Sequence, residues 1–156
     1  QRMCRLYEKF LLEYYRKEHP ELSANASQIA WQLDDSENQL LPKMQTDIML
    51  SQGNNILIID AKYYSHTTQQ QYGTNTLHSN NLYQIFTYVK NKDFELRELE
   101  HTVSGMLLYA QTDEDVIPNN TYQMSGNQIS VRALDLNQDF PGIAEDLDSI
   151  VKDNFT

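Results

Sequence analysis

The strongest constraint on the fold comes from residues 55–64 (NILIIDAKYY), where four consecutive aliphatic residues precede an aspartate and a lysine. An apolar run of this length without alternation is typical of a strand that is covered on both faces. The preceding stretch, 44–51 (MQTDIMLS), predicts a second strand, and the residues at 52–55 (QGNN) tolerate the positive φ angles of a tight turn. The sequence therefore predicts a hairpin in the middle of a sheet.

Helices and further strands are predicted on both sides of this hairpin. Apolar residues at three- and four-residue steps predict helices over 3–18, 81–92 and 140–155, the second capped by Asn80 or Asn81. Their apolar positions are Met3, Leu6, Tyr7, Phe10, Leu11, Tyr14, Leu82, Ile85, Phe86, Val89, Ile143, Leu147, Ile150 and Val151. The other predicted segments are a strand at 28–33, a loop at 34–43, a long mobile loop at 65–81, a strand at 102–110 and a hairpin at 121–136 that turns at 125–127. This order predicts one α/β domain, a mixed central sheet flanked by helices.

Composition excludes several classes of protein. No apolar run reaches the roughly 18 residues that a membrane helix needs. The single cysteine, Cys4, excludes a disulfide framework and fits a reducing, cytoplasmic compartment. No G-x-x-x-x-G-K-[ST] motif occurs, so we expect no nucleotide triphosphate bound through a P-loop. Because the helical pattern begins almost at Gln1, we expect residues 1–156 to be the C-terminal part of a longer polypeptide.

Two acids and a lysine on the predicted hairpin suggest a metal site. Asp60 and Lys62 are two residues apart and therefore point to the same face of the sheet, and Asp47 lies on the neighbouring strand. Buried charges are costly unless they have partners. A divalent cation shared by Asp47 and Asp60 would be such a partner, and carboxylate oxygens suit Mg²⁺ or Mn²⁺. The alternative is an ordinary ion pair between Asp60 and Lys62 at the end of a strand.

Five segments in the same order resemble a known family. They are LYEKF (6–10), TDIML (46–50), ILIIDAKYY (56–64), NLYQIFTYV (81–89) and GMLLYA (105–110). The acid followed by D-x-K resembles the PD-(D/E)xK nuclease superfamily, and the whole set resembles the McrC family, the endonuclease subunits of 5-methylcytosine-specific restriction systems. The resemblance implies a restriction-endonuclease-like αβββαβ core, followed here by a hairpin and a helix.

The resemblance also implies roles for particular residues. Asp47 and Asp60 would hold Mg²⁺, Lys62 would be the catalytic lysine, and Glu8 would reach the metal directly or through water. Gln84 matches a position on the second helix that can face the site. The alternatives are a solvated helix charge for Glu8 and a surface amide for Gln84. The usual proline before the first acid is Thr46 here, which changes the strand entry without removing a ligand.

The implied activity is DNA cleavage by a metal-activated water. GTP hydrolysis and recognition of the modified base would belong to a separate McrB-like GTPase subunit, and cutting both strands would call for dimerisation. Two rivals stay open: a PD-(D/E)xK nuclease of repair or recombination that acts alone, and an assembly subunit whose nuclease fold no longer cleaves.

The charge distribution bears on DNA binding. The chain has 12 basic and 22 acidic residues, a net charge of −10, which argues against holding nucleic acid mainly through a basic surface. Residues 111–156 hold −7 of this charge, so residues 1–110 carry only −3. We therefore expect the part that bears the site to bind DNA weakly and to depend on a partner or on a missing N-terminal region.

Overall fold

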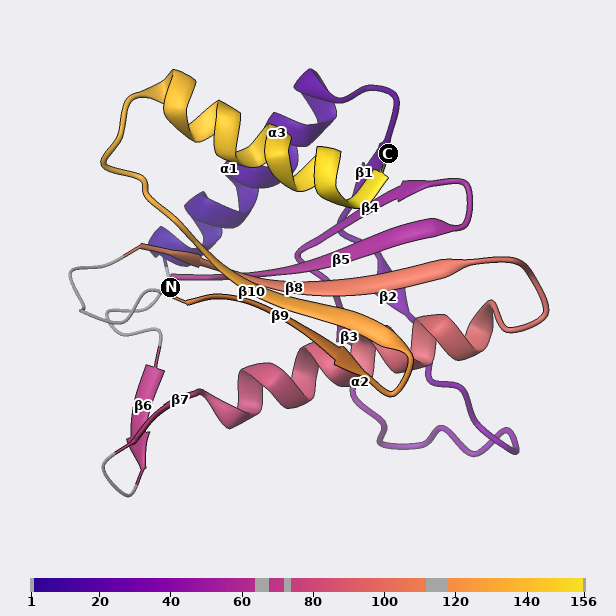
Figure 1. Cartoon of the computed structure of the whole chain (residues 1–156). Coiled ribbons are helices and arrows are strands. Elements are labelled where there is room, and N and C mark those ends of the chain that lie inside the picture. Colours follow the sequence, from indigo (N-terminus) through magenta and orange to yellow (C-terminus); the bar gives the residue numbers. More distant parts are fainter. Residues whose placement is uncertain (1, 64–67, 72–73, 112–117, 156) are drawn as a thin grey trace.

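The computed structural model describes residues 2–63, 68–71, 74–111 and 118–155. Its elements follow in chain order (Figure 1): α1 (Arg2–Glu18), β1 (Ser23–Asn25), β2 (Gln28–Ile29), β3 (Met44–Gln45), β4 (Ile48–Gln52), β5 (Asn55–Lys62), β6 (Thr68–Gln71), β7 (Thr74–Leu77), α2 (Ser79–Glu95), β8 (Thr102–Ala110), β9 (Asn119–Met124), β10 (Asn127–Leu134) and α3 (Phe140–Phe155). None of the helices described is both long and apolar enough to cross a membrane.

The main sheet is mixed, with the strand order β1-β4-β5-β8-β10-β9. β4 is antiparallel to β1 and β5, β8 is parallel to β5 and β10, and the edge strand β9 is antiparallel to β10. Two short ladders, β2-β3 and β6-β7, lie outside this sheet. The predicted α/β class and mixed sheet are confirmed, as are the central hairpin and the C-terminal hairpin and helix.

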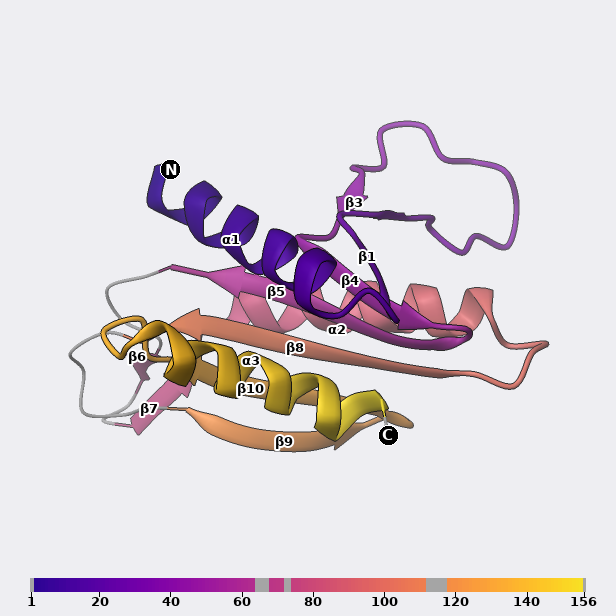
Figure 2. The ribbon, with the colours of Figure 1, turned by 90° about the horizontal axis from the view of Figure 1, so that it is seen from above.

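Helices cover both faces of the sheet. α1 and α3 lie side by side on one face, and α2 lies on the other (Figures 1 and 2). Strand β5 contributes to both resulting cores: Leu57 and Ile59 face α1 and α3, and the two residues that alternate with them face α2. Fully burying each of these aliphatic side chains contributes about 1.5–3 kcal/mol. On the other face, α2 approaches β8 so closely at Gly105 that an added Cβ would lie 2.6 Å from Val89 Cγ2.

The buried face of α1 differs in part from the prediction. Met3 and Leu6 are 50% and 61% exposed, whereas Tyr15 is fully buried. The apolar stripe of α1 is wider than the surface that its neighbours cover, so sequence periodicity alone does not select the buried part. Contacts with α3 select it, because the Tyr15 hydroxyl donates a hydrogen bond to the Leu147 carbonyl at 2.9 Å.

Two predicted strands have the wrong boundaries, and one strand was missed. The strand expected at 28–33 is only β2, and β1 was not predicted. The strand expected at 44–51 is interrupted between β3 and β4, because the backbone N and Oγ1 of Thr46 both donate to the Ser27 carbonyl, at 3.0 and 2.7 Å. Such a contact between distant residues leaves no local signal in the sequence.

The segment before α2 also differs from its prediction. Within the loop expected at 65–81, β6 and β7 pair with each other and α2 begins at Ser79, while 65–67 and 72–73 lie outside the described residues. The N-cap residue is His78 and not Asn80 or Asn81. Asn81 is buried and donates a hydrogen bond to the Tyr109 hydroxyl at 2.9 Å, so its side chain serves the core instead.

Candidate active site

The central hairpin brings Asp47, Asp60 and Lys62 together. Ile48 pairs with Ile59, so the next residues outward, Asp47 and Asp60, lie across the hairpin from each other. The backbone N–H of Ala61 donates to Asp47 Oδ2 at 2.8 Å, which fixes the orientation of that carboxylate. The adjacency expected from the hairpin is therefore present, while the chemical roles of these residues stay predictions.

Asp60 is the most constrained member of this group. Its side chain is 7% exposed, and its Oδ2 is buried without a hydrogen bond of acceptable geometry. Lys62 Nζ lies 3.3 Å from that oxygen, which is ion-pair distance but not an aligned hydrogen bond. The pKa of Asp60 is raised to about 8, first by burial and then by contact with the Asp47 carboxylate, while the Lys62 charge acts to lower it. Additional positive charge would stabilise the ionised form of this buried carboxylate.

Glu8 joins the group from helix α1. Its pKa is raised, first by burial, then by the negative charge of Asp47 and a hydrogen bond between the two carboxyl groups. The charges of Lys62 and Arg5 act in the opposite direction. The side chain of Glu8 therefore faces the acids of the hairpin, which argues against the alternative of a solvated charge on the helix surface.

Gln84 reaches the site from helix α2. Lys62 Nζ donates to Gln84 Oε1 at 3.2 Å, and Gln84 Nε2 donates to the Tyr88 hydroxyl at 3.0 Å. The Tyr88 hydroxyl donates in turn to the Gln45 carbonyl at 3.3 Å. This chain of hydrogen bonds ties the lysine to the strand just before Asp47. Sequence reasoning missed Tyr88, although its position four residues after Gln84 puts both on one side of the helix.

The donor set fits a divalent cation of the Mg²⁺ type. No group of three or more His, Cys, Asp or Glu side chains is arranged to hold a metal ion in the part of the chain that the structure describes. Mg²⁺ does not need such a cage, since it is usually held by one or two carboxylates, waters and substrate phosphates. Asp47 and Asp60 supply two carboxylates, and the buried Asp60 Oδ2 has no aligned hydrogen bond, which leaves it able to bind a metal ion.

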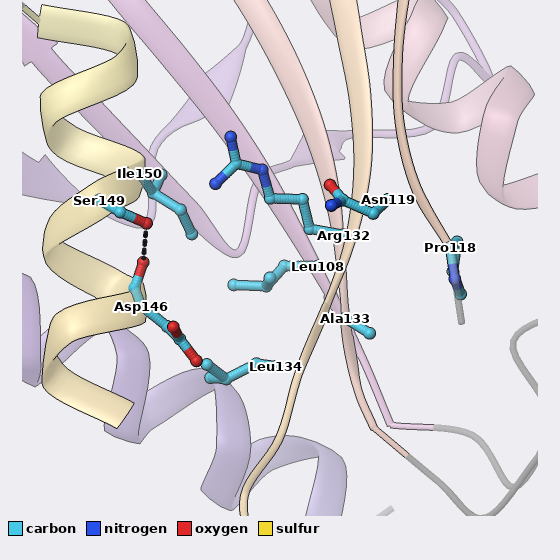
Figure 3. A pocket seen from close by; sticks show the side chains of 9 residues that line it. All are labelled: Leu108, Pro118, Asn119, Arg132, Ala133, Leu134, Asp146, Ser149 and Ile150. Carbon is cyan, nitrogen blue, oxygen red and sulfur yellow. Dashed lines mark hydrogen bonds between the residues drawn. The ribbon is translucent and has the colours of Figure 1, made fainter. Parts of the chain in front are cut away.

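A cavity of about 340 Å³ lies elsewhere, between the sheet and α3 (Figure 3). Its lining residues are Leu108, Pro118, Asn119, Arg132, Ala133, Leu134, Asp146, Ser149 and Ile150. None of the predicted site residues lines it. Lys62 instead contacts α2, which covers the opposite face of the sheet. The candidate site therefore lies apart from this cavity.

Comparison with known proteins supplies the family. A family model described as McrBC 5-methylcytosine restriction system component matches residues 1–110, which include the five predicted site residues. The chain belongs to this McrBC family. The Type IV methyl-directed restriction enzyme EcoKMcrBC of Escherichia coli (strain K12) is 34% identical over 148 residues, or 93% of this chain and 41% of the relative. The chain thus spans less than half the length of that McrBC protein. The resemblance found in the sequence motifs is confirmed, and the chain is a restriction-system component by family.

Proposed function

We propose that the chain is a Mg²⁺-dependent DNA endonuclease module of a 5-methylcytosine-directed restriction system. The observation that carries the proposal is the buried Asp60 Oδ2, which lies beside Asp47 and 3.3 Å from Lys62 in a chain of the McrBC family. Mn²⁺ is an alternative ion with similar ligand preferences.

The order of the elements supports a restriction-endonuclease-like core. Helix α1 precedes the three antiparallel strands β1, β4 and β5 of the main sheet, and α2 leads to β8, which is parallel to β5. This sequence of elements matches the αβββαβ pattern expected from the motifs. It brings an acid of α1 toward Asp47 and an amide of α2 within hydrogen-bond distance of Lys62.

Each residue of the site would have its own task in phosphodiester hydrolysis. A metal held by Asp47 and Asp60 would supply an activated water and neutralise charge on the phosphate. Lys62 would donate from Nζ to the attacking water or to a phosphate oxygen, and so stabilise charge that develops there. Gln84 and Tyr88 would hold Lys62 in position. Glu8 would bind the metal or a water of its shell, and its raised pKa makes it a stronger proton acceptor than a free glutamate.

The proposed partners are DNA and a McrB-like GTPase. Residues 1–110 carry a net charge of −3, which is unfavourable for holding a polyanion without help. A separate GTPase that recognises the modified base would deliver the duplex to this module in the cytoplasm. Pairing of two modules would then cut both strands.

The test is cleavage of methylated DNA by the natural polypeptide together with its cognate GTPase. We expect Asp60→Ala, Asp47→Ala and Lys62→Ala to abolish cutting while circular dichroism shows a retained fold. Asp34→Ala is the control, because Asp34 is an exposed acid of the 34–43 loop. Cutting by Asp60→Ala would refute the site assignment.

The same assay separates the rivals. Efficient cutting of unmodified DNA without any NTPase would favour a nuclease that acts alone. Absence of both cutting and Mg²⁺ binding in the unsubstituted protein would favour an assembly subunit.

A further inference from the structure

Most basic side chains in the described part of the chain already have acidic or carbonyl partners. Arg132 pairs with Asp153 at 2.7 Å, and Lys90 donates to two oxygen atoms of the β9–β10 turn. Four basic residues differ, because they are exposed and none of them forms an ion pair or hydrogen bond with a described residue: Arg5, Lys9 and Lys17 of α1, and Lys43. Their charge is therefore available to a ligand.

Of these four residues, Arg5 lies beside the candidate active site, since its positive charge acts on Glu8. Arg5 is three residues before Glu8, so the two side chains are neighbours on the helix surface. The first turns of α1 contact the end of β5, where Cys4 Sγ lies 3.7 Å from the Tyr63 carbonyl oxygen. This end of β5 carries Lys62. Lys9 follows Arg5 by one helical turn, on the outer side of α1.

We propose that Arg5, with Lys9, binds backbone phosphates of DNA next to the phosphate that is cleaved. This inference rests on the proposed nuclease function and specifies where the DNA backbone contacts the protein. The negative charges of Glu8, Asp47 and Asp60 repel the phosphates of an approaching DNA strand. The positive charges of Arg5 and Lys9 would offset this repulsion. Lys62 is held within the site by Gln84, which leaves Arg5 and Lys9 for docking.

The arginine side chain of Arg5 is well suited to binding a DNA phosphate. Its planar guanidinium can donate two parallel hydrogen bonds to one phosphate, whereas the Lys9 ammonium acts as a point charge. We therefore assign Arg5 the larger share of binding. Both residues would contact the substrate away from the reacting atoms, so they should affect KM more than kcat.

The experiment compares DNA affinity across salt concentrations for the natural polypeptide assembled with its GTPase. Fluorescence anisotropy with a methylated duplex is measured for the unsubstituted protein, Arg5→Ala, Lys9→Ala and Lys17→Ala. Lys17 is the matched control, an exposed lysine on the last turn of the same helix, away from the site. Each lost phosphate contact lowers the slope of log K against log [salt] by about 0.9.

We expect Arg5→Ala to weaken DNA binding about 5- to 10-fold at 0.1 M salt and to lower the slope of log K against log [salt] by about 0.9, the value for one phosphate contact. Arg5→Ala should also raise KM at nearly constant kcat. Lys17→Ala should match the unsubstituted protein. An unchanged slope in Arg5→Ala, or an equal loss in Lys17→Ala, would overturn the proposal.

A parallel Asp60→Ala sample separates this proposal from the function on which it rests. If the nuclease assignment fails, either Asp60→Ala still cuts or the unsubstituted protein does not cut at all. If only the Arg5 proposal fails, Asp60→Ala is inactive while Arg5→Ala binds DNA like the unsubstituted protein.

Discussion

Replacing Asp60 by asparagine is expected to stabilise the metal-free protein at pH 8. Asp60 is buried, and its pKa is raised to about 8, first by burial and then by Asp47. A group whose pKa is raised on folding costs nothing at low pH, because it is protonated in both states. As pH rises from about 4 to 8, the unfolded chain ionises freely while the folded protein does not, so the free energy of unfolding falls.

The size of the effect follows from the shift. Each unit of pKa corresponds to about 1.4 kcal/mol, so a pKa near 8 instead of 3.8 sets a ceiling of about 5 kcal/mol at pH 8. The observed gain should be smaller, because Lys62 loses an ion-pair partner at 3.3 Å and keeps only its other contacts, Gln84 among them. We expect Asp60→Asn to raise the free energy of unfolding by about 2 kcal/mol at pH 8.

Urea unfolding in EDTA, followed by circular dichroism at pH 4.5, 6, 7 and 8, measures this gain. The difference between Asp60→Asn and the unsubstituted protein should grow with pH and nearly vanish at the lowest value. Adding Mg²⁺ at 100 times its dissociation constant should stabilise the unsubstituted protein by about 2.7 kcal/mol and leave Asp60→Asn unchanged.

Two results would refute this reasoning. One is a loss of stability in Asp60→Asn that is the same at every pH, which would mean that the carboxylate is already well satisfied in the fold. The other is equal stabilisation of both proteins by Mg²⁺, which would place the metal away from Asp60.

Three further substitutions test other parts of the structure. Tyr88→Phe removes the hydroxyl that accepts from Gln84; urea unfolding should show a loss of about 1 kcal/mol, and kinetics a several-fold lower kcat. Burial lowers the pKa of His19, but the hydrogen bond to Asp148 at 2.7 Å helps to raise this pKa overall. The unsubstituted protein should therefore lose about 0.5 kcal/mol of folding stability between pH 6 and 8, and His19→Gln should abolish this loss. Gly105→Ala puts a methyl group against α2 and should lower stability by about 1–3 kcal/mol in thermal unfolding.

Each of these predictions has a contradicting outcome. Unchanged kcat in Tyr88→Phe would remove the role of its hydrogen-bond chain in positioning Lys62. A pH profile of His19→Gln that parallels that of the unsubstituted protein would show that this histidine contributes no pH-dependent stability. A Tm of Gly105→Ala equal to that of the unsubstituted protein would mean that α2 moves away from β8 at little cost.

The central part of the fold was predictable because its signals are local. The apolar run of β5 and the turn at Gly53, which has a φ of 61°, fix a hairpin, and the hairpin puts Asp47 opposite Asp60. The apolar face of α3 was predictable for the same reason, since its helical period is unbroken and all four expected residues are buried.

The parts that were missed depend on contacts between distant residues. Whether Leu6 is covered depends on how α1 and α3 pack together, and the break before β4 depends on Ser27. Within the site, Glu8 and Gln84 were predicted from the resemblance to the family motifs, because the helical pattern alone does not show that they face the site. Tyr88 was not predicted at all, because nothing in the local sequence shows that its hydroxyl lies beside Gln84.

The central claim is that Asp47 and Asp60 together hold a divalent metal ion. A crystal of the protein grown with Mn²⁺ and measured for anomalous scattering tests it most directly. We expect one anomalous peak within coordinating distance, roughly 2.0–2.3 Å, of an oxygen of each carboxylate, and no peak at this position in Asp60→Asn. A Mn²⁺ peak elsewhere, with no density between these two carboxylates at saturating metal, would contradict it.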